Sequence, residues 1–174
     1  MPLEIHICID YQQKGKIKMT ITREKQIEIN NAADKIFKEY LFGLGIMTSV
    51  RKEINRLMGV HPATRLTVNL LTGPAPERIN PEIFKHLVEL HSNATCITNC
   101  CKIMMIKLFE PVINDIIETE YSDYLQYRAD LHEEGISGVL LAMGQEYPEA
   151  FPHYCQRIIV EMYRFLDQRG LIKE

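Results

Sequence analysis

The chain has 174 residues, of which 46% are hydrophobic and 25% are charged, and its formal net charge is −3. This length and composition are typical of a globular chain that buries a core, most simply as one domain. No apolar run approaches the roughly 20 residues of a membrane helix, so we expect no membrane partner. The N-terminus lacks the pattern of a signal peptide, and five cysteines are an odd number, so we expect reduced thiols and a cytoplasmic location.

Charge is distributed unevenly along the chain. Residues 1–80 hold twelve lysines and arginines against eight acids, whereas residues 110–150 hold ten acids against Arg128 alone. An acidic segment repels phosphate, so a nucleic-acid surface would lie in the N-terminal half. The acidic segment 110–150 is interpreted as a solvated helix face, or as a surface that pairs with a basic partner on the same or another chain.

The N-terminal third changes its hydrophobic period at Arg23. Residues 3–10 and 16–22 alternate apolar and polar side chains on either side of a glycine-containing turn, which predicts a β-hairpin. From Arg23 the apolar residues recur at intervals of three and four residues, which predicts a helix that ends at the "GLG" of 43–45. A second helix is expected from about Thr48 to Met58, with Gly59 as its C-terminal cap.

Prolines mark the next boundaries. The stretch "GPAPERINPE", 73–82, predicts a loop, and a helix should start at about Pro81 and continue through His91. Ser92 and Asn93 are expected to interrupt it before an almost wholly apolar helix over 94–109, which Pro111 should kink or divide.

The remaining chain also predicts helices. Apolar residues of the acidic segment recur at helical spacing from Ile113 to Leu125, and residues 151–170 form an amphipathic pattern that ends at Gly170. The predicted fold is mainly α, a helical bundle-like domain with a small N-terminal β-hairpin. Its expected parts are 1–72, the proline-rich loop 73–82 and the helical region 83–174, packed together as one domain.

The stretch "RKEINRLMGVHPATRL", residues 51–66, resembles the helix-turn-helix of bacterial and phage repressors, which also has Gly-Val after an apolar helix and Thr shortly afterwards. The resemblance covers about twenty residues, 51–70, and implies a turn at Gly59, an apolar plug at Val60 and a second helix that begins near Pro62.

The resemblance also implies roles for side chains. Arg51, Lys52 and Arg56 would contact phosphates, while Thr64, Arg65 and Asn69 would be offered to base edges, with His61 in the turn beside them. An alternative remains open, because Leu66, Val68 and Leu70 alternate with polar residues, and residues 64–71 are therefore also compatible with a β-strand.

The sequence contains no clear pattern of a metal site, a phosphate-binding loop or a catalytic site. Cys96, Cys100 and Cys101 lack the paired spacing of a zinc site and alternate with apolar residues, so we interpret them as buried thiols and expect no metal. The chain contains no glycine-rich phosphate motif, and His153 and Cys155 would diverge on a helix. We therefore expect no cofactor and no enzymatic activity.

Two functions remain as hypotheses. The first is a small DNA-binding regulator of bacterial or mobile-element type that binds double-stranded DNA through the seven residues named above, with a homodimer as its expected assembly. The second is a non-enzymatic helical adaptor or oligomerisation protein that binds another chain through its hairpin edge or its acidic helical face.

Overall fold

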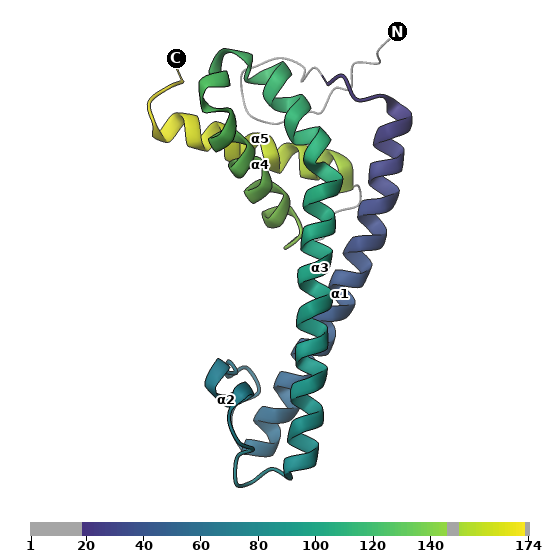
Figure 1. Ribbon diagram of the computed structural model, residues 1–174, viewed down its shortest axis with the longest axis vertical. Helices are drawn as coiled ribbons and strands as arrows, with labels where there is room; N and C mark the ends of the chain where they lie inside the picture. The colour runs from purple at the N-terminus through teal and green to yellow at the C-terminus, as the bar shows by residue number, and fades with distance from the viewer. Residues whose placement is uncertain (1–18, 146–149, 173–174) are drawn as a thin grey trace. The chain divides into compact units, whose positions relative to one another are not determined.

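A computed structural model describes residues 19–145 and 150–172 (Figure 1). These residues are mainly helical and contain no β-strand, which confirms the mainly α class. The predicted hairpin falls almost entirely on residues 1–18, outside the described ones. No described helix has the length and apolar character needed to cross a membrane. The elements are α1 (Arg23–Met58), α2 (Val68–Thr72), α3 (Pro81–Glu120), a 3-10 helix (Ser122–Tyr127), α4 (Arg128–Ala142) and α5 (Ala150–Gln168).

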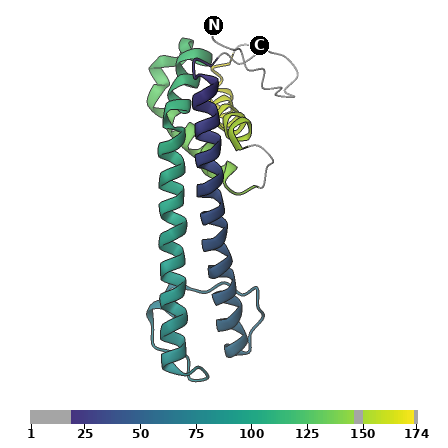
Figure 2. The same cartoon turned by 90° about the vertical axis from the view of Figure 1, so that its right-hand side faces the viewer.

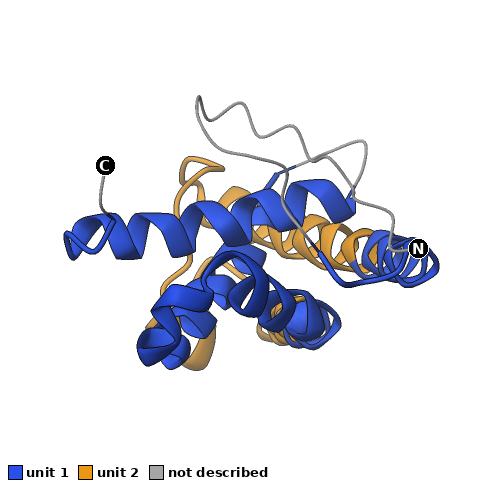
Figure 3. Cartoon of the chain, turned by 90° about the horizontal axis from the view of Figure 1, so that it is seen from above, with its two compact units in different colours: residues 1–36, 102–174 blue, residues 37–101 orange. Residues whose placement is uncertain are grey.

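The chain divides into two compact units (Figure 3). Unit 1 comprises residues 1–36 and 102–174, and unit 2 comprises residues 37–101, so α1 and α3 contribute to both. This division differs from the predicted boundary, because the proline-rich loop 73–82 lies inside unit 2. The physical reason is packing: Ala75 and Ile79 from this loop join the same hydrophobic cluster as α1 and α3.

The core of unit 1 forms where α3 meets α5. The Phe109 ring is fully buried and stacks on Tyr154 with ring centroids 4.5 Å apart, and on Phe151 at 6.2 Å. On α5, the predicted apolar stripe is buried from Phe151 through Ile158 to Leu166, which confirms the amphipathic helix. Aromatic stacking of this kind adds to the burial of apolar area.

Two glycines allow α4 to approach its neighbours in unit 1. A Cβ added at Gly138 would lie 2.7 Å from the Ile158 Cα, which is α5 backbone that cannot turn away. At Gly135 an added Cβ would lie 2.7 Å from Ile113 Cγ2. The absence of side chains at these two positions lets α4 pack closely on α5 and α3.

Unit 2 is built around a pair of helices. The α1 and α3 segments lie side by side here (Figure 1, Figure 2), and the chain between them folds back on one end. Val50, Ile54, Ile79 and Phe84 form its buried cluster. Leu66 and Leu70 pack against that cluster. The segment between the two helices therefore covers one end of the buried contact between α1 and α3, which we call the seam.

Both long helices continue where the sequence predicted breaks. The expected end at 43–45 is wrong, because Gly43 sits against α3: an added Cβ would lie 2.8 Å from Thr98 Cγ2. Close packing there offsets the roughly 1 kcal/mol that glycine costs in a helix. The interruption expected at Ser92 and Asn93 is also wrong, since both side chains are exposed on α3 and cost little there.

Pro111 lies inside α3 and does not divide it, so the predicted division is wrong. Pro111 is exposed. Proline has no N–H to donate to the carbonyl four residues earlier, so α3 lacks one backbone hydrogen bond at this position.

Candidate functional site

Helix α1 ends at Gly59 as the sequence predicted. The Gly59 N–H donates to the Arg56 carbonyl at 3.1 Å, and the Val60 N–H donates to the Asn55 carbonyl at 3.0 Å. This pair of bonds is a Schellman motif, which needs a left-handed residue, and Gly59 has φ +70°. Gly59 therefore ends the helix through local hydrogen bonds. These bonds do not determine the conformation of the residues that follow Val60.

Asn55 determines how the chain continues after Gly59. Its fully buried side-chain amide donates to the Pro62 carbonyl at 3.1 Å and to the Thr64 carbonyl at 2.7 Å. These two carbonyls accept from a side chain and not from the backbone of a helix, and residues 59–67 are not helical. The predicted second helix from Pro62 is therefore absent, and so is the alternative strand over 64–71, because helix α2 begins at Val68.

The helix-turn-helix arrangement is not formed in unit 2. That motif joins two helices by three or four residues, whereas nine residues separate α1 from α2, which is itself one turn long. Thr67 caps α2 by accepting a hydrogen bond from the Leu70 N–H at 3.2 Å. A helix this short cannot serve as the recognition element that the resemblance implied.

The seven predicted site residues lie at one end of unit 2. They are spread over three segments and do not share one helix. Arg51 is partly buried and the other six are exposed. The Ala63 N–H donates to His61 Nδ1 at 3.2 Å, which places the imidazole over its own turn. Three of the seven lie on α1 (Arg51, Lys52, Arg56), three on the loop (His61, Thr64, Arg65) and one on α2 (Asn69).

One of the three predicted phosphate contacts is already paired. The Arg56 guanidinium binds both carboxylate oxygens of Glu53, at 2.6 and 2.8 Å. This hydrogen bond lowers the pKa of Glu53, and the Glu53 carboxylate offsets the charge of Arg56. Arg78 is not among the predicted site residues, but its Nη1 lies 3.6 Å from the Cβ position of Gly59. No motif points to Arg78, since only the folding of the loop brings it there.

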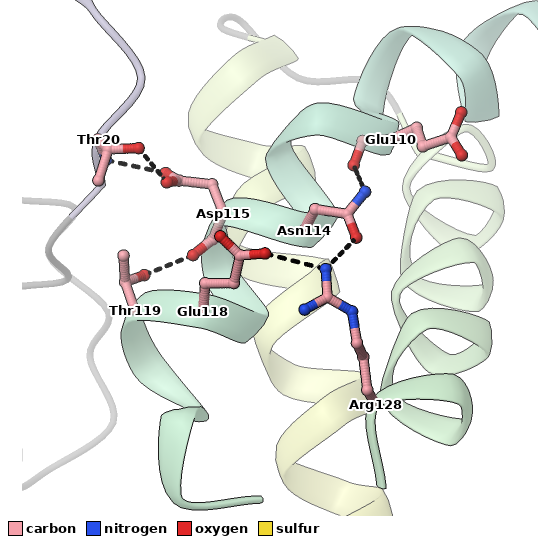
Figure 4. Close-up of polar contacts among 7 residues, drawn as sticks. All are labelled: Thr20, Glu110, Asn114, Asp115, Glu118, Thr119 and Arg128. Carbon is pink, nitrogen blue, oxygen red and sulfur yellow. Dashed lines mark hydrogen bonds and ion pairs between the residues drawn. The ribbon is translucent and has the colours of Figure 1, made fainter. Parts of the chain in front are cut away.

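The acidic segment of unit 1 is partly used for structure (Figure 4). The buried Asp115 carboxylate accepts hydrogen bonds from the backbone N–H and the hydroxyl of Thr20. The Arg128 guanidinium donates to Asn114 Oδ1 at 3.2 Å and to Glu118 Oε1 at 2.9 Å. Arg128, the single basic residue of the segment, therefore links α4 to α3 and neutralises one carboxylate.

The thiols differ from their predicted burial. Cys101 and Cys155 are buried, but Cys96 and Cys100 are exposed, so the expectation that all were buried is wrong for this pair. The reason is their place on α3: Ala94, Thr98 and Cys101 point toward the seam, and Cys96 and Cys100 fall on the opposite side of the helix. Burial raises the pKa of the Cys101 thiol.

A row of apolar side chains lies on α3 along the edge of its buried contact with α1. Ile83 is 53% exposed, Leu90 is 38% exposed and Ile97 is partly buried. Residues seven apart share one helix face. Ile97 Cγ2 lies 3.4 Å from the Cβ position of Gly43, which places this stripe beside the α1 turn that carries the 66% exposed Phe42. We call Ile83, Leu90 and Ile97 the α3 stripe.

Searches of protein-family models, curated proteins and solved structures found no match to this chain. The candidate sites therefore rest on the geometry described above: the basic end of unit 2, the α3 stripe, the exposed thiols and the acidic segment.

Proposed function

We propose that this chain is a non-catalytic helical protein whose unit 2 assembles with a second copy of itself through the α3 stripe. The observation that carries the proposal is the exposure of Ile83 and Leu90, seven residues apart on the long helix α3. Exposed apolar surface that is contiguous along a helix is typical of an interaction surface.

The spacing of the stripe favours a second copy over an unrelated partner. Ile83 and Ile97 lie seven residues on either side of Leu90. In a two-fold symmetric contact between antiparallel α3 helices, Leu90 meets its own counterpart, and Ile83 of each chain meets Ile97 of the other. Such an interface is self-complementary, as two-fold dimers require. Knobs-into-holes packing accepts this seven-residue repeat.

Sedimentation equilibrium of the wild type and of Leu90→Glu tests this proposal. We expect a dimer for the wild type and a monomer for the variant, because two carboxylates would face each other across the symmetry axis. Val68→Glu is the matched control, since Val68 is 74% exposed in unit 2 but lies on α2. Equal masses for Leu90→Glu and the wild type would refute the proposal, as would a monomeric wild type.

A second candidate function is contact with duplex DNA, favoured by the positive charge at the end of unit 2. Residues 51–78 hold five arginines and lysines against two acids. Without a recognition helix, we propose contacts to the phosphate backbone by Lys52 and Arg65, with little reading of sequence. Such binding would weaken steeply with salt, because it depends on the release of counterions.

Fluorescence anisotropy with random duplex DNA tests this second function. The variant Lys52→Ala, Arg65→Ala should lose binding at low salt. The matched control removes two exposed lysines from unit 1, Lys35→Ala and Lys107→Ala. If both double variants lose the same affinity, the effect is one of net charge and the basic end of unit 2 has no special role. Absence of wild-type binding at low salt would eliminate the DNA hypothesis.

A further inference from the structure

Cys96 and Cys100 form a pair of exposed thiols on α3. They are four residues apart in an unbroken helix, so they occupy consecutive turns of one face. The two thiols also influence each other, because the Cys96 side chain is the largest cause of a raised pKa at Cys100. Among the described cysteines, these two alone reach solvent.

The helix geometry disfavours a disulfide between these thiols. Side chains at this spacing have Cβ atoms about 5–6 Å apart, whereas a disulfide needs about 3.5–4.5 Å. Forming the S–S bond would therefore distort α3. A metal ion between the sulfurs adds a bond on each side, and at about 2.3 Å per metal–thiolate bond it lets the sulfurs lie up to roughly 4–5 Å apart.

The number and softness of the donors select the ion. In the described parts of the chain, no group of three or more histidine, cysteine, aspartate and glutamate side chains could hold a metal. A structural zinc ion needs four ligands, so two thiolates are too few for it. Magnesium and calcium bind oxygen ligands, so thiolates do not suit them. Soft thiolates select copper(I), an ion for which two donors can suffice.

We propose that Cys96 and Cys100 bind one copper(I) ion on the outer face of α3. Two Cys–SH groups and one Cu⁺ give a bis-thiolate copper(I) complex with net charge −1 and release two protons. No electron is transferred, because copper enters as the monovalent ion. The affinity should rise with pH, since the thiols must lose their protons for binding.

An anaerobic titration of the reduced full-length chain with copper(I), in competition with the chromogenic chelator bicinchoninate, tests the proposal. We expect the wild type to withdraw one equivalent of copper(I) from the chelator. Cys96→Ser and Cys100→Ser should each lose that equivalent. Because both positions are exposed, circular dichroism should show unchanged helicity in the two variants.

A displaced pair is the matched control. Ser92 is exposed on α3, and the double substitution Ser92→Cys with Cys96→Ser keeps two exposed thiols but places them eight residues apart. One ion cannot bridge that distance of about 12 Å along the helix. Retention of the equivalent by this variant, or by either single serine variant, would overturn the proposal, as would a wild type that withdraws no copper.

Discussion

Unit 1 and unit 2 are both helical, but they bury very different amounts of side chain. Of the largest side chains that are completely buried in the described residues, Ile54 belongs to unit 2 and the others, such as Phe109 and Met162, belong to unit 1. A helix pair offers few positions that are covered on all sides, whereas helices packed on several sides enclose a core. The comparison indicates that unit 1 carries most of the stability, and that unit 2 leaves apolar side chains available for contacts.

The strongest test of this comparison uses the same substitution in both units. Phe109→Ala removes a fully buried ring from unit 1 and should cost about 3–5 kcal/mol of unfolding free energy. Phe42→Ala removes a 66% exposed ring from unit 2 and should change stability by at most about 0.5 kcal/mol. Urea unfolding followed by circular dichroism measures both. Equal losses would break the distinction between the two units.

Substitution of Asn55 tests the buried amide that binds the loop after α1 in unit 2. Asn55→Ala leaves the Pro62 and Thr64 carbonyls without their amide donor, so we expect a loss of about 1–3 kcal/mol. Hydrogen exchange should become faster over residues 60–66, while the core of unit 1 keeps its protection. Asn99→Ala, on the exposed face of α3, is the control. Unchanged exchange in the loop would show that Asn55 does not hold it.

Glycine substitutions sharpen the comparison further, because they should have opposite signs in the two units. Gly138→Ala forces its Cβ to within 2.8 Å of the Arg157 carbonyl and should cost about 1–3 kcal/mol. Gly45→Ala meets nothing within 4 Å and should gain up to about 1 kcal/mol from helix propensity. Thermal unfolding measures the stability of both variants against the wild type. A destabilised Gly45→Ala would mean that this face of α1 is covered.

A pH dependence of the stability is expected from His153 in unit 1. Burial, followed by the charge of Arg157, lowers its pKa from 6.5 to about 4. The unfolded chain therefore binds more protons than the folded chain between these values, and stability falls as the pH decreases through this window.

Removal of the imidazole isolates the contribution of His153 to the pH dependence of stability. His153→Gln should lose less stability than the wild type between about pH 7 and about pH 5 in urea titrations. His86→Gln, exposed in unit 2, should behave as the wild type does. An identical pH dependence in His153→Gln and the wild type would contradict the assignment.

Local signals in the sequence predicted several helix ends. Gly59 and Gly170 both adopt positive φ and close Schellman motifs, and Asn80 caps α3 by accepting from the Glu82 N–H at 2.9 Å just before Pro81. These features involve residues at most five apart, so the local chain is sufficient to specify them. The sequence by itself therefore determined the mainly α class and the ends of α1 and α5.

The tertiary structure decided what local patterns left ambiguous. Gly43 stays in a helix because Thr98 of α3 packs on it, and residues 61–67 form a loop because the Asn55 amide binds their carbonyls. The exposure of Cys96 and Cys100 likewise depends on which face of α3 meets α1. Each outcome depends on a partner outside the local pattern, and contacts of that kind, worth one to a few kcal/mol, outweigh propensities of about 1 kcal/mol or less.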